Sequence, residues 1–162
     1  MNFENLKMTA LINGFSLLKL PLLAFITPRV IELTDTRSMV RVRLGLRTRN
    51  HLGVMYFGAL AMGAELSIAL KAVQTIAKSG KRIDFLFKDF DGQFLKRADG
   101  HTHFVCDDAA GVADLIATAG RDFERHERKF KGYAFVPGKS EEPVMKYSLT
   151  LSVKQRQKKT KA

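Results

Sequence analysis

The stretch Phe57-Gly-Ala-Leu-Ala-Met-Gly-Ala-Glu-Leu-Ser-Ile-Ala-Leu70 decides the fold of this chain. Most of its residues favour an α-helix, and Glu65 is the only charged side chain in it. A helix that is apolar on nearly every side is buried. Its glycines and alanines let neighbouring backbone approach closely, as when a sheet wraps around a central helix. The sequence therefore predicts a buried helix over residues 57–78, ended by Ser79-Gly80.

Period-two patterns on both sides of this helix predict the strands that wrap it. Apolar residues alternate with charged ones, and turn signals such as Asp99-Gly100 separate the runs. Two other helical regions are expected, an amphipathic helix over 108–127 and an N-terminal region over 3–24 that breaks near Asn13-Gly14. An antiparallel sheet packed on one long helix is an α+β architecture. The predicted strands cover residues 30–33, 40–47, 83–95, 101–106, 129–136 and 144–153.

The composition limits the class of protein. The chain has 162 residues and 46% of them are apolar, which is too many for an intrinsically disordered chain. Lys and Arg number 27 against 16 Asp and Glu, so the formal net charge is +11. Cys106 is the single cysteine, so no intrachain disulfide forms and we expect a reducing, cytoplasmic environment. No run of eighteen apolar residues occurs, and we expect no membrane span.

Glu65 is the most informative single residue. A carboxylate inside an otherwise apolar helix must be paired, face a cleft or be protonated. Desolvation would raise its pKa, which suits a general base, and a carboxylate at a small wet pocket could also orient water or act as a nucleophile. The alternative is a structural glutamate that forms an ion pair with one of the many arginines.

The start of the predicted helix is a second candidate feature. Gly58 lies in its first turn, where free backbone N–H groups can bind an anion or a carbonyl that is becoming an oxyanion. A residue without a side chain also lets a substrate come close. The alternative is a glycine that only allows close packing.

Together these residues form a more specific pattern, Asn50-x-x-Gly53-x-x-Tyr56-x-Gly58 followed by Glu65. It resembles the segment that opens the central helix of the hotdog-fold acyl-CoA thioesterases. In the phenylacetic-acid-type branch this segment reads Asn-x-x-Gly-x-x-His-Gly-Gly, with an Asp or Glu nine residues after the His. Tyr56 and Glu65 are also nine residues apart. The run Arg49-Asn50-His51-Leu52-Gly53 is most similar to an uncharacterised branch labelled as a domain of unknown function.

The resemblance implies a hotdog fold over residues 28–153, an antiparallel sheet wrapped around the long helix. Residues 1–27 would then be an N-terminal helical segment, and residues 154–162 a basic, disordered tail. It also implies a homodimer or homotetramer with active sites at the subunit interface and no cofactor. The substrate would be acyl-CoA or a related acyl thioester.

The resemblance further implies a role for each residue of the pattern. Glu65 would be the general base or nucleophile, the N–H near Gly58 would hold the carbonyl oxygen, and Asn50 would orient the attacking water or the carboxylate. The remaining positions would contact substrate. Tyr56 replaces the usual His and Phe57 the first usual Gly, which leaves a second function open, an acyl or acyl-CoA binder without hydrolysis. The substrate-binding candidates are Arg49, Gly53, Tyr56 and Phe57.

Basic and histidine residues suggest other functions. A strand without a bulge would place five odd-numbered arginines on one face, where they could contact coenzyme A phosphates or nucleic acid. No nucleic-acid motif accompanies them, so nucleic acid is the less favoured partner. His101 and His103 could bind a metal ion with Asp107 or Asp108, but exposed polar residues at a hairpin end explain them more simply, and we expect no metal site. The arginines are Arg37, Arg41, Arg43, Arg47 and Arg49.

Overall fold

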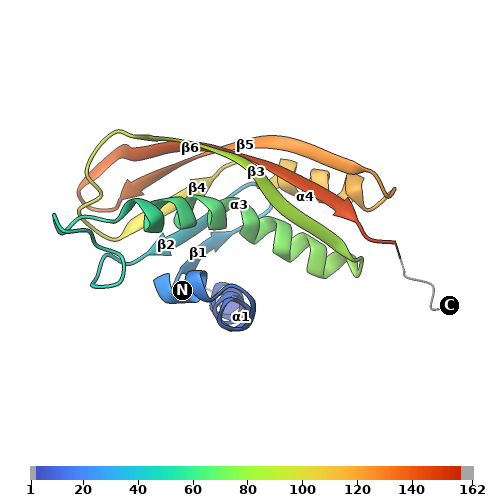
Figure 1. Ribbon diagram of the computed structural model, residues 1–162, viewed down its shortest axis with the longest axis horizontal. Coiled ribbons are helices and arrows are strands. Elements are labelled where there is room, and N and C mark those ends of the chain that lie inside the picture. Colours follow the sequence, from blue (N-terminus) through green and yellow to red (C-terminus); the bar gives the residue numbers. More distant parts are fainter. Residues whose placement is uncertain (1–2, 158–162) are drawn as a thin grey trace.

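The computed structural model describes residues 3–157, apart from the side chains of residues 15–19, 140 and 141. It contains one six-stranded antiparallel sheet with the strand order β1-β2-β4-β5-β6-β3, which curves over the long helix α3 (Figure 1). This arrangement confirms the predicted α+β class and the hotdog fold. The strands are β1 Arg29–Leu33, β2 Ser38–Val42, β3 Ile83–Phe94, β4 Thr102–Cys106, β5 Arg125–Val136 and β6 Ser140–Gln155.

The central helix α3 spans Phe57–Ser79 and lies against the concave face of the sheet, as predicted. Gly80 ends it in the left-handed conformation, with a φ of 63°. Gly63 faces the sheet so closely that a Cβ atom there would lie 2.3 Å from the ring of Phe104. In length and apolar composition α3 could cross a membrane, yet most of the helix is buried inside this fold.

The N-terminal region forms α1, Phe3–Lys19, and α2, Pro21–Ile26. The predicted break near Asn13-Gly14 is wrong, because α1 continues through these residues. The Asn13 side chain donates hydrogen bonds to the carbonyl oxygens of Thr9, at 2.9 Å, and Pro28, at 3.0 Å. The break falls instead before Pro21, which has no N–H to continue the helix.

Helix α4 spans Ala109–Ala119 and is shorter than the predicted helix over 108–127. Asp108 caps its start by accepting a hydrogen bond from the N–H of Gly111 at 3.0 Å. Gly120 follows the last helical residue, and β5 already begins at Arg125. The sequence predicted a longer helix because Phe123 continues the helical spacing of apolar residues beyond Ala119. In the structure Phe123 is half-exposed and lies outside the helix.

Strand β2 is also shorter than predicted, because the chain turns after Val42. The Thr48 hydroxyl donates to the carbonyl of Arg43 at 2.6 Å and accepts from the N–H of Gly45 at 3.0 Å, which fixes this turn. Only Arg41 of the five arginines therefore lies in the strand, and the predicted cationic row is wrong.

At the other end of the chain, β6 runs through Gln155, two residues into the expected tail, and residues 158–162 lie outside the described part.

The two edges of the sheet differ. Three polar residues of α1, spaced four apart, bond the backbone of the chain entering β1 and of β1 itself: the Asn5 amide donates to Ile31 O at 2.6 Å, and the Thr9 hydroxyl accepts from Val30 N at 3.0 Å. Asn13 makes the third contact, to Pro28 O. Strand β3 forms the other edge, and no described side chain of a helix makes such a hydrogen bond to it. Its unpaired backbone groups are therefore open to a partner.

Candidate active site

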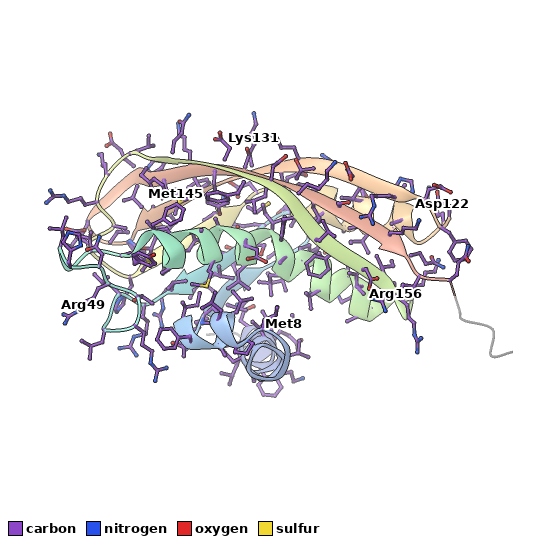
Figure 2. All side chains as sticks on the ribbon, viewed as in Figure 1. Met8, Arg49, Asp122, Lys131, Met145 and Arg156 are labelled. Atoms are coloured by element: carbon purple, nitrogen blue, oxygen red, sulfur yellow. The ribbon has the colours of Figure 1, made fainter. Side chains whose placement is uncertain are left out.

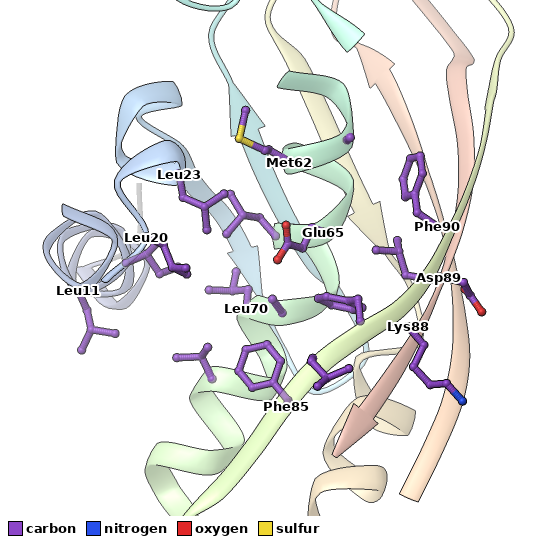
Figure 3. Close-up of a pocket in the computed structure, with 18 residues that line it drawn as sticks. Leu11, Leu20, Leu23, Met62, Glu65, Leu70, Phe85, Lys88, Asp89 and Phe90 are labelled. Atoms are coloured by element: carbon purple, nitrogen blue, oxygen red, sulfur yellow. The ribbon is translucent and has the colours of Figure 1, made fainter. Parts of the chain in front are cut away.

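Glu65 lies on the wall of a cavity with a volume of about 1080 Å³. The cavity is bounded by α3, by strand β3 and by the N-terminal helices, and Figure 3 shows the Glu65 carboxylate pointing into it. Apart from Glu65, Lys88 and Asp89, all of its lining residues are apolar. They are Leu11, Ile12, Leu20, Leu23, Ala61, Met62, Leu66, Ala69, Leu70, Val73, Phe85, Leu86, Phe87, Phe90 and Leu149.

The Glu65 carboxylate makes no hydrogen bond or ion pair with any described side chain, that is, within residues 3–157 apart from the side chains of 15–19, 140 and 141. Burial among apolar side chains raises the pKa of this carboxyl. The two other charged residues of the cavity point away from it in Figure 3 and have partners elsewhere. Lys88 pairs with Glu127 at 2.6 Å, and Asp89 accepts from the hydroxyl of Thr150 at 2.7 Å. The alternative that Glu65 is a structural residue in an ion pair with an arginine is therefore wrong.

An unpaired carboxylate in an apolar cavity is a strong base, since protonation relieves the cost of its desolvated charge. It can take a proton from a water molecule beside it, or attack an electrophilic carbonyl directly. Both reactions need a second group that stabilises the negative charge on the carbonyl oxygen.

The loop before α3 contains Asn50 and Gly53. The Asn50 side-chain oxygen accepts hydrogen bonds from the N–H groups of Leu52, at 2.9 Å, and Val54, at 3.3 Å. Gly53 has a φ of 76°, which a residue with a side chain rarely adopts. Both residues thus shape the turn that leads into the helix, and only the amide N–H₂ of Asn50 is left to reach a ligand. Arg49 is exposed at the end of the molecule, as Figure 2 shows.

At the helix start, Tyr56 is the N-cap residue and makes no side-chain capping hydrogen bond. Its ring covers Gly58, because a Cβ atom on Gly58 would lie 2.8 Å from Cε1 of Tyr56. Phe57 packs edge-on against Phe94 of β3, with ring centroids 5.6 Å apart. The rings of Tyr56 and Phe57 are more than half exposed. The helix start is therefore surrounded by aromatic rings that face outward.

Gly58 and Glu65 lie on the same face of α3, because seven residues make two helical turns. They are about 10 Å apart along the axis at 1.5 Å per residue. None of the other predicted site residues, Arg49, Asn50, Gly53, Tyr56, Phe57 and Gly58, lines the cavity with Glu65. Within one chain the carboxylate and the helix start are thus separate parts of a site.

The N-terminal helices contribute a wall that the sequence analysis did not assign to the site. Leu11, Leu20 and Leu23 line the cavity opposite β3, as seen in Figure 3. Leucines in a short N-terminal helix indicate only that the helix packs somewhere, so sequence offered no signal for which surface they cover.

Other chemical groups do not form a competing site. Burial raises the pKa of the Cys106 thiol to about 11, so it is not a reactive thiolate. His101 accepts a hydrogen bond from the N–H of Leu44 at 3.1 Å, and His103 packs against the ring of Phe135. Among residues 3–157, no three His, Cys, Asp or Glu side chains gather in a way that could hold a metal ion.

Solved structures share this fold. A protein of unknown function from Chlorobaculum tepidum has a TM-score of 0.78 and 10% identity, over 94% of this chain and 97% of that one. A probable thioesterase from Pseudomonas aeruginosa has a TM-score of 0.69 and 20% identity, over 91% and 96%. A thioesterase from Haemophilus influenzae has a TM-score of 0.66 and 11% identity, over 93% and 92%.

The sheet order, the central helix and these neighbours define a hotdog-fold protein. Residues 9–153 match the model of one family, described as Domain of unknown function (DUF4442), and the chain belongs to that family. This confirms the resemblance to an uncharacterised hotdog branch. A search of curated proteins finds no significant match to the sequence.

Proposed function

We propose that this protein is a thioesterase that hydrolyses acyl-CoA or a related acyl thioester. The observation that carries the proposal is Glu65, a carboxylate of raised pKa in an apolar cavity of the hotdog fold, with no hydrogen-bond or ion-pair partner among the described side chains. The neighbours named as thioesterases support the same reaction. A structural glutamate would be expected to have a hydrogen-bond or ion-pair partner.

The proposed reaction begins with a thioester carbonyl beside Glu65. The carboxylate takes a proton from water, and the hydroxide equivalent adds to the carbonyl carbon. As an alternative for the same group, the carboxylate itself adds to that carbon and water later cleaves the mixed anhydride. In both cases the C–S bond breaks, the thiol leaves with a proton, and a carboxylic acid is the product.

The oxyanion formed in this step needs a donor, and the N–H groups near Gly58 are the candidates. The separation of about 10 Å between Gly58 and Glu65 is too large for both to act on one carbonyl from the same chain. We infer a homo-oligomer in which Glu65 of one subunit faces the helix start of the other. Asn50 then reaches the water or the carboxylate with its amide N–H₂ group, and Arg49 lies outside, where a phosphate of coenzyme A would be.

The exposed edge strand β3 supports this assembly. Phe90 is 38% exposed and Phe94 is 48% exposed, and Phe94 contacts Phe57 at the helix start. The opposite edge is already bonded to α1. A second copy that pairs along β3 would cover these rings and place its own helix start near the cavity.

The test is thiol release from a panel of acyl-CoA substrates by the wild type and by Glu65→Gln. Loss of a general base lowers turnover by about 10²- to 10⁴-fold. The Glu32→Gln variant, on β1, is the matched control and retains wild-type turnover. Turnover unchanged in folded, oligomeric Glu65→Gln would refute the mechanism.

The second candidate function is an acyl or acyl-CoA binder that does not hydrolyse its ligand. The ring of Tyr56 over Gly58 favours it, since that ring stands where a substrate carbonyl would approach the N–H groups. Saturable acyl-CoA binding with no thiol release from the wild type would select this function. In that case the double variant Tyr56→His, Phe57→Gly opens the helix start and is expected to gain thiol release.

A further inference from the structure

The cavity is elongated along helix α3. Past Glu65 it follows α3 through Leu66, Ala69, Leu70 and Val73, which share one helix face. On the other side of Glu65 it is lined by Ala61 and Met62. The eight residues from Glu65 to Val73 correspond to about 12 Å of helix axis. An acyl chain whose thioester lies beside Glu65, as the proposed function requires, can extend along this path toward Val73.

The walls along this path are apolar. Phe85, Leu86 and Phe87 of β3 form one side. Leu20, which joins α1 and α2, and Leu23 of α2 form the side that faces them. Lys88 and Asp89 border the cavity, but their charged groups point outward to partners on β5 and β6 (Figure 3). Among the described lining residues, Glu65 is the one hydrogen-bonding group that points into this space, which suits an alkyl chain and disfavours a polar one.

The N-terminal wall is anchored to the sheet. The three polar residues of α1 that bond Pro28 and β1 leave Leu11 and Ile12 of the same helix to line the cavity. Ile26 of α2 is almost fully buried. The helices α1 and α2 are thus a built part of the cavity, and removing them would open it along one side.

We propose that the cavity is a channel for an unbranched aliphatic acyl chain of about eight to ten carbons, with α1 and α2 as its outer wall. The length follows from the 12 Å path, because an extended chain with C–C bonds of ~1.5 Å advances about 1.3 Å per carbon. The volume of about 1080 Å³ is more than a small acid needs. This inference rests on the proposed function for the position of the thioester, but the binding itself does not require hydrolysis.

The absence of tryptophan from the sequence allows a direct test. Leu20→Trp places a single tryptophan on the half-exposed part of the wall, and Leu46→Trp places one at a position that is 82% exposed and outside the cavity. The probe is 10-bromodecan-1-ol, whose bromine quenches tryptophan on contact and whose uncharged head avoids repulsion by Glu65. We expect saturable quenching in Leu20→Trp and none in Leu46→Trp. Equal quenching in both variants, or none in either, would overturn the channel.

Chain length is measured with unbrominated alkan-1-ols that compete with this probe in Leu20→Trp. Affinity is expected to rise about fourfold per methylene and to level off at about ten carbons. Adding Val73→Phe blocks the far end, so the plateau moves to a chain shorter by about four carbons, roughly one helical turn. Gln74→Phe, one residue on and outside the cavity lining, leaves the plateau in place. An affinity that keeps rising with chain length, or a plateau at the same chain length in Val73→Phe, would refute the proposed acyl channel.

The two proposals fail separately. Alkanol binding with the expected plateau, together with unchanged thiol release by Glu65→Gln, would retain the channel and reject the catalytic role of Glu65. Thiol release that depends on Glu65 but shows no chain-length limit would retain the catalytic role of Glu65 and reject the channel.

Discussion

The side-chain oxygens of Ser67, on α3, and Tyr147, on β6, lie 2.7 Å apart in the interior of the protein. The Tyr147 hydroxyl also donates to the carbonyl of Val105 on β4 at 3.0 Å, and the Ser67 hydroxyl reaches the carbonyl of Ala64 at 2.7 Å. The hydroxyl groups of Ser67 and Tyr147 are thus joined to each other and to the carbonyl oxygens of Ala64 and Val105. Burial raises the pKa of Tyr147, so the phenol stays protonated and keeps its donor. The Tyr147 hydroxyl, which lies on β6, therefore connects the central helix α3 with strand β4 through hydrogen bonds.

Tyr147→Phe is expected to lower the free energy of unfolding by about 1–2 kcal/mol, because the Val105 carbonyl loses a buried donor while the ring stays in place. Urea denaturation measures this change. The matched control is Tyr133→Phe, on the outer face of the sheet, which should change the free energy by less than about 0.5 kcal/mol. Equal losses in the two variants would mean that the buried hydrogen bonds do not hold the helix to the sheet.

Gly63→Ala and Gly14→Ala are expected to change stability in opposite directions, although both glycines lie inside helices. Alanine favours a helix over glycine by about 1 kcal/mol. Nothing lies within 4 Å of a Cβ atom on Gly14, so that variant becomes more stable. A Cβ atom on Gly63 would lie 2.3 Å from the ring of Phe104, so that variant loses stability by about 1–3 kcal/mol. Thermal unfolding compares them, and a stabilised Gly63→Ala would contradict the close packing of helix and sheet.

Much of the fold could be predicted from the sequence because the central helix is unusual. Its apolar surface and small residues require a sheet around it, and the period-two segments supply that sheet. The errors concern local hydrogen bonds. Thr48 turns the chain after β2, and Asn13 bonds along its own helix, and neither contact is visible in a hydrophobic pattern.

The candidate site could be predicted only in part. Glu65 stands out in sequence as the lone charge in the apolar stretch 57–70, and the structure places it in a cavity where no described side chain pairs with it. The wall formed by Leu20 and Leu23 could not be predicted, because its position depends on how α1 bonds to β1. The roles of Asn50 and Gly58 remain predictions, since they depend on a second subunit.

Glu65→Gln is expected to raise the stability of the protein above pH 4.5 while it removes turnover. The unfolded chain ionises this carboxyl near 4.5, and burial raises its pKa in the folded state. At this group the folded state therefore holds more protons just above pH 4.5, so the contribution of Glu65 to wild-type stability falls as pH rises through this interval and is then constant. Glutamine cannot ionise, so the stability difference between the variants grows over the same interval.

Urea denaturation of both variants at several pH values measures this difference. The acid limb of kcat/KM for the wild type should likewise lie above pH 4.5, because the ionised carboxylate is the active form. A stability difference that does not depend on pH would show that Glu65 is not desolvated.

Phe90→Asp is expected to convert the oligomer into monomers. Phe90 lies on the free edge strand β3, and a charge there would have to be buried without a partner when a second copy pairs with this edge. Sedimentation equilibrium measures the mass, and the wild type should have at least twice the mass of one chain. Leu46→Asp makes the same change in an exposed loop and should leave the oligomer intact. Because the proposed site combines two subunits, Phe90→Asp should also lose thiol release while its alkanol binding weakens less. A Phe90→Asp variant that stays oligomeric would place the interface elsewhere than on β3, and a monomeric variant with full turnover would show that one chain holds the whole site.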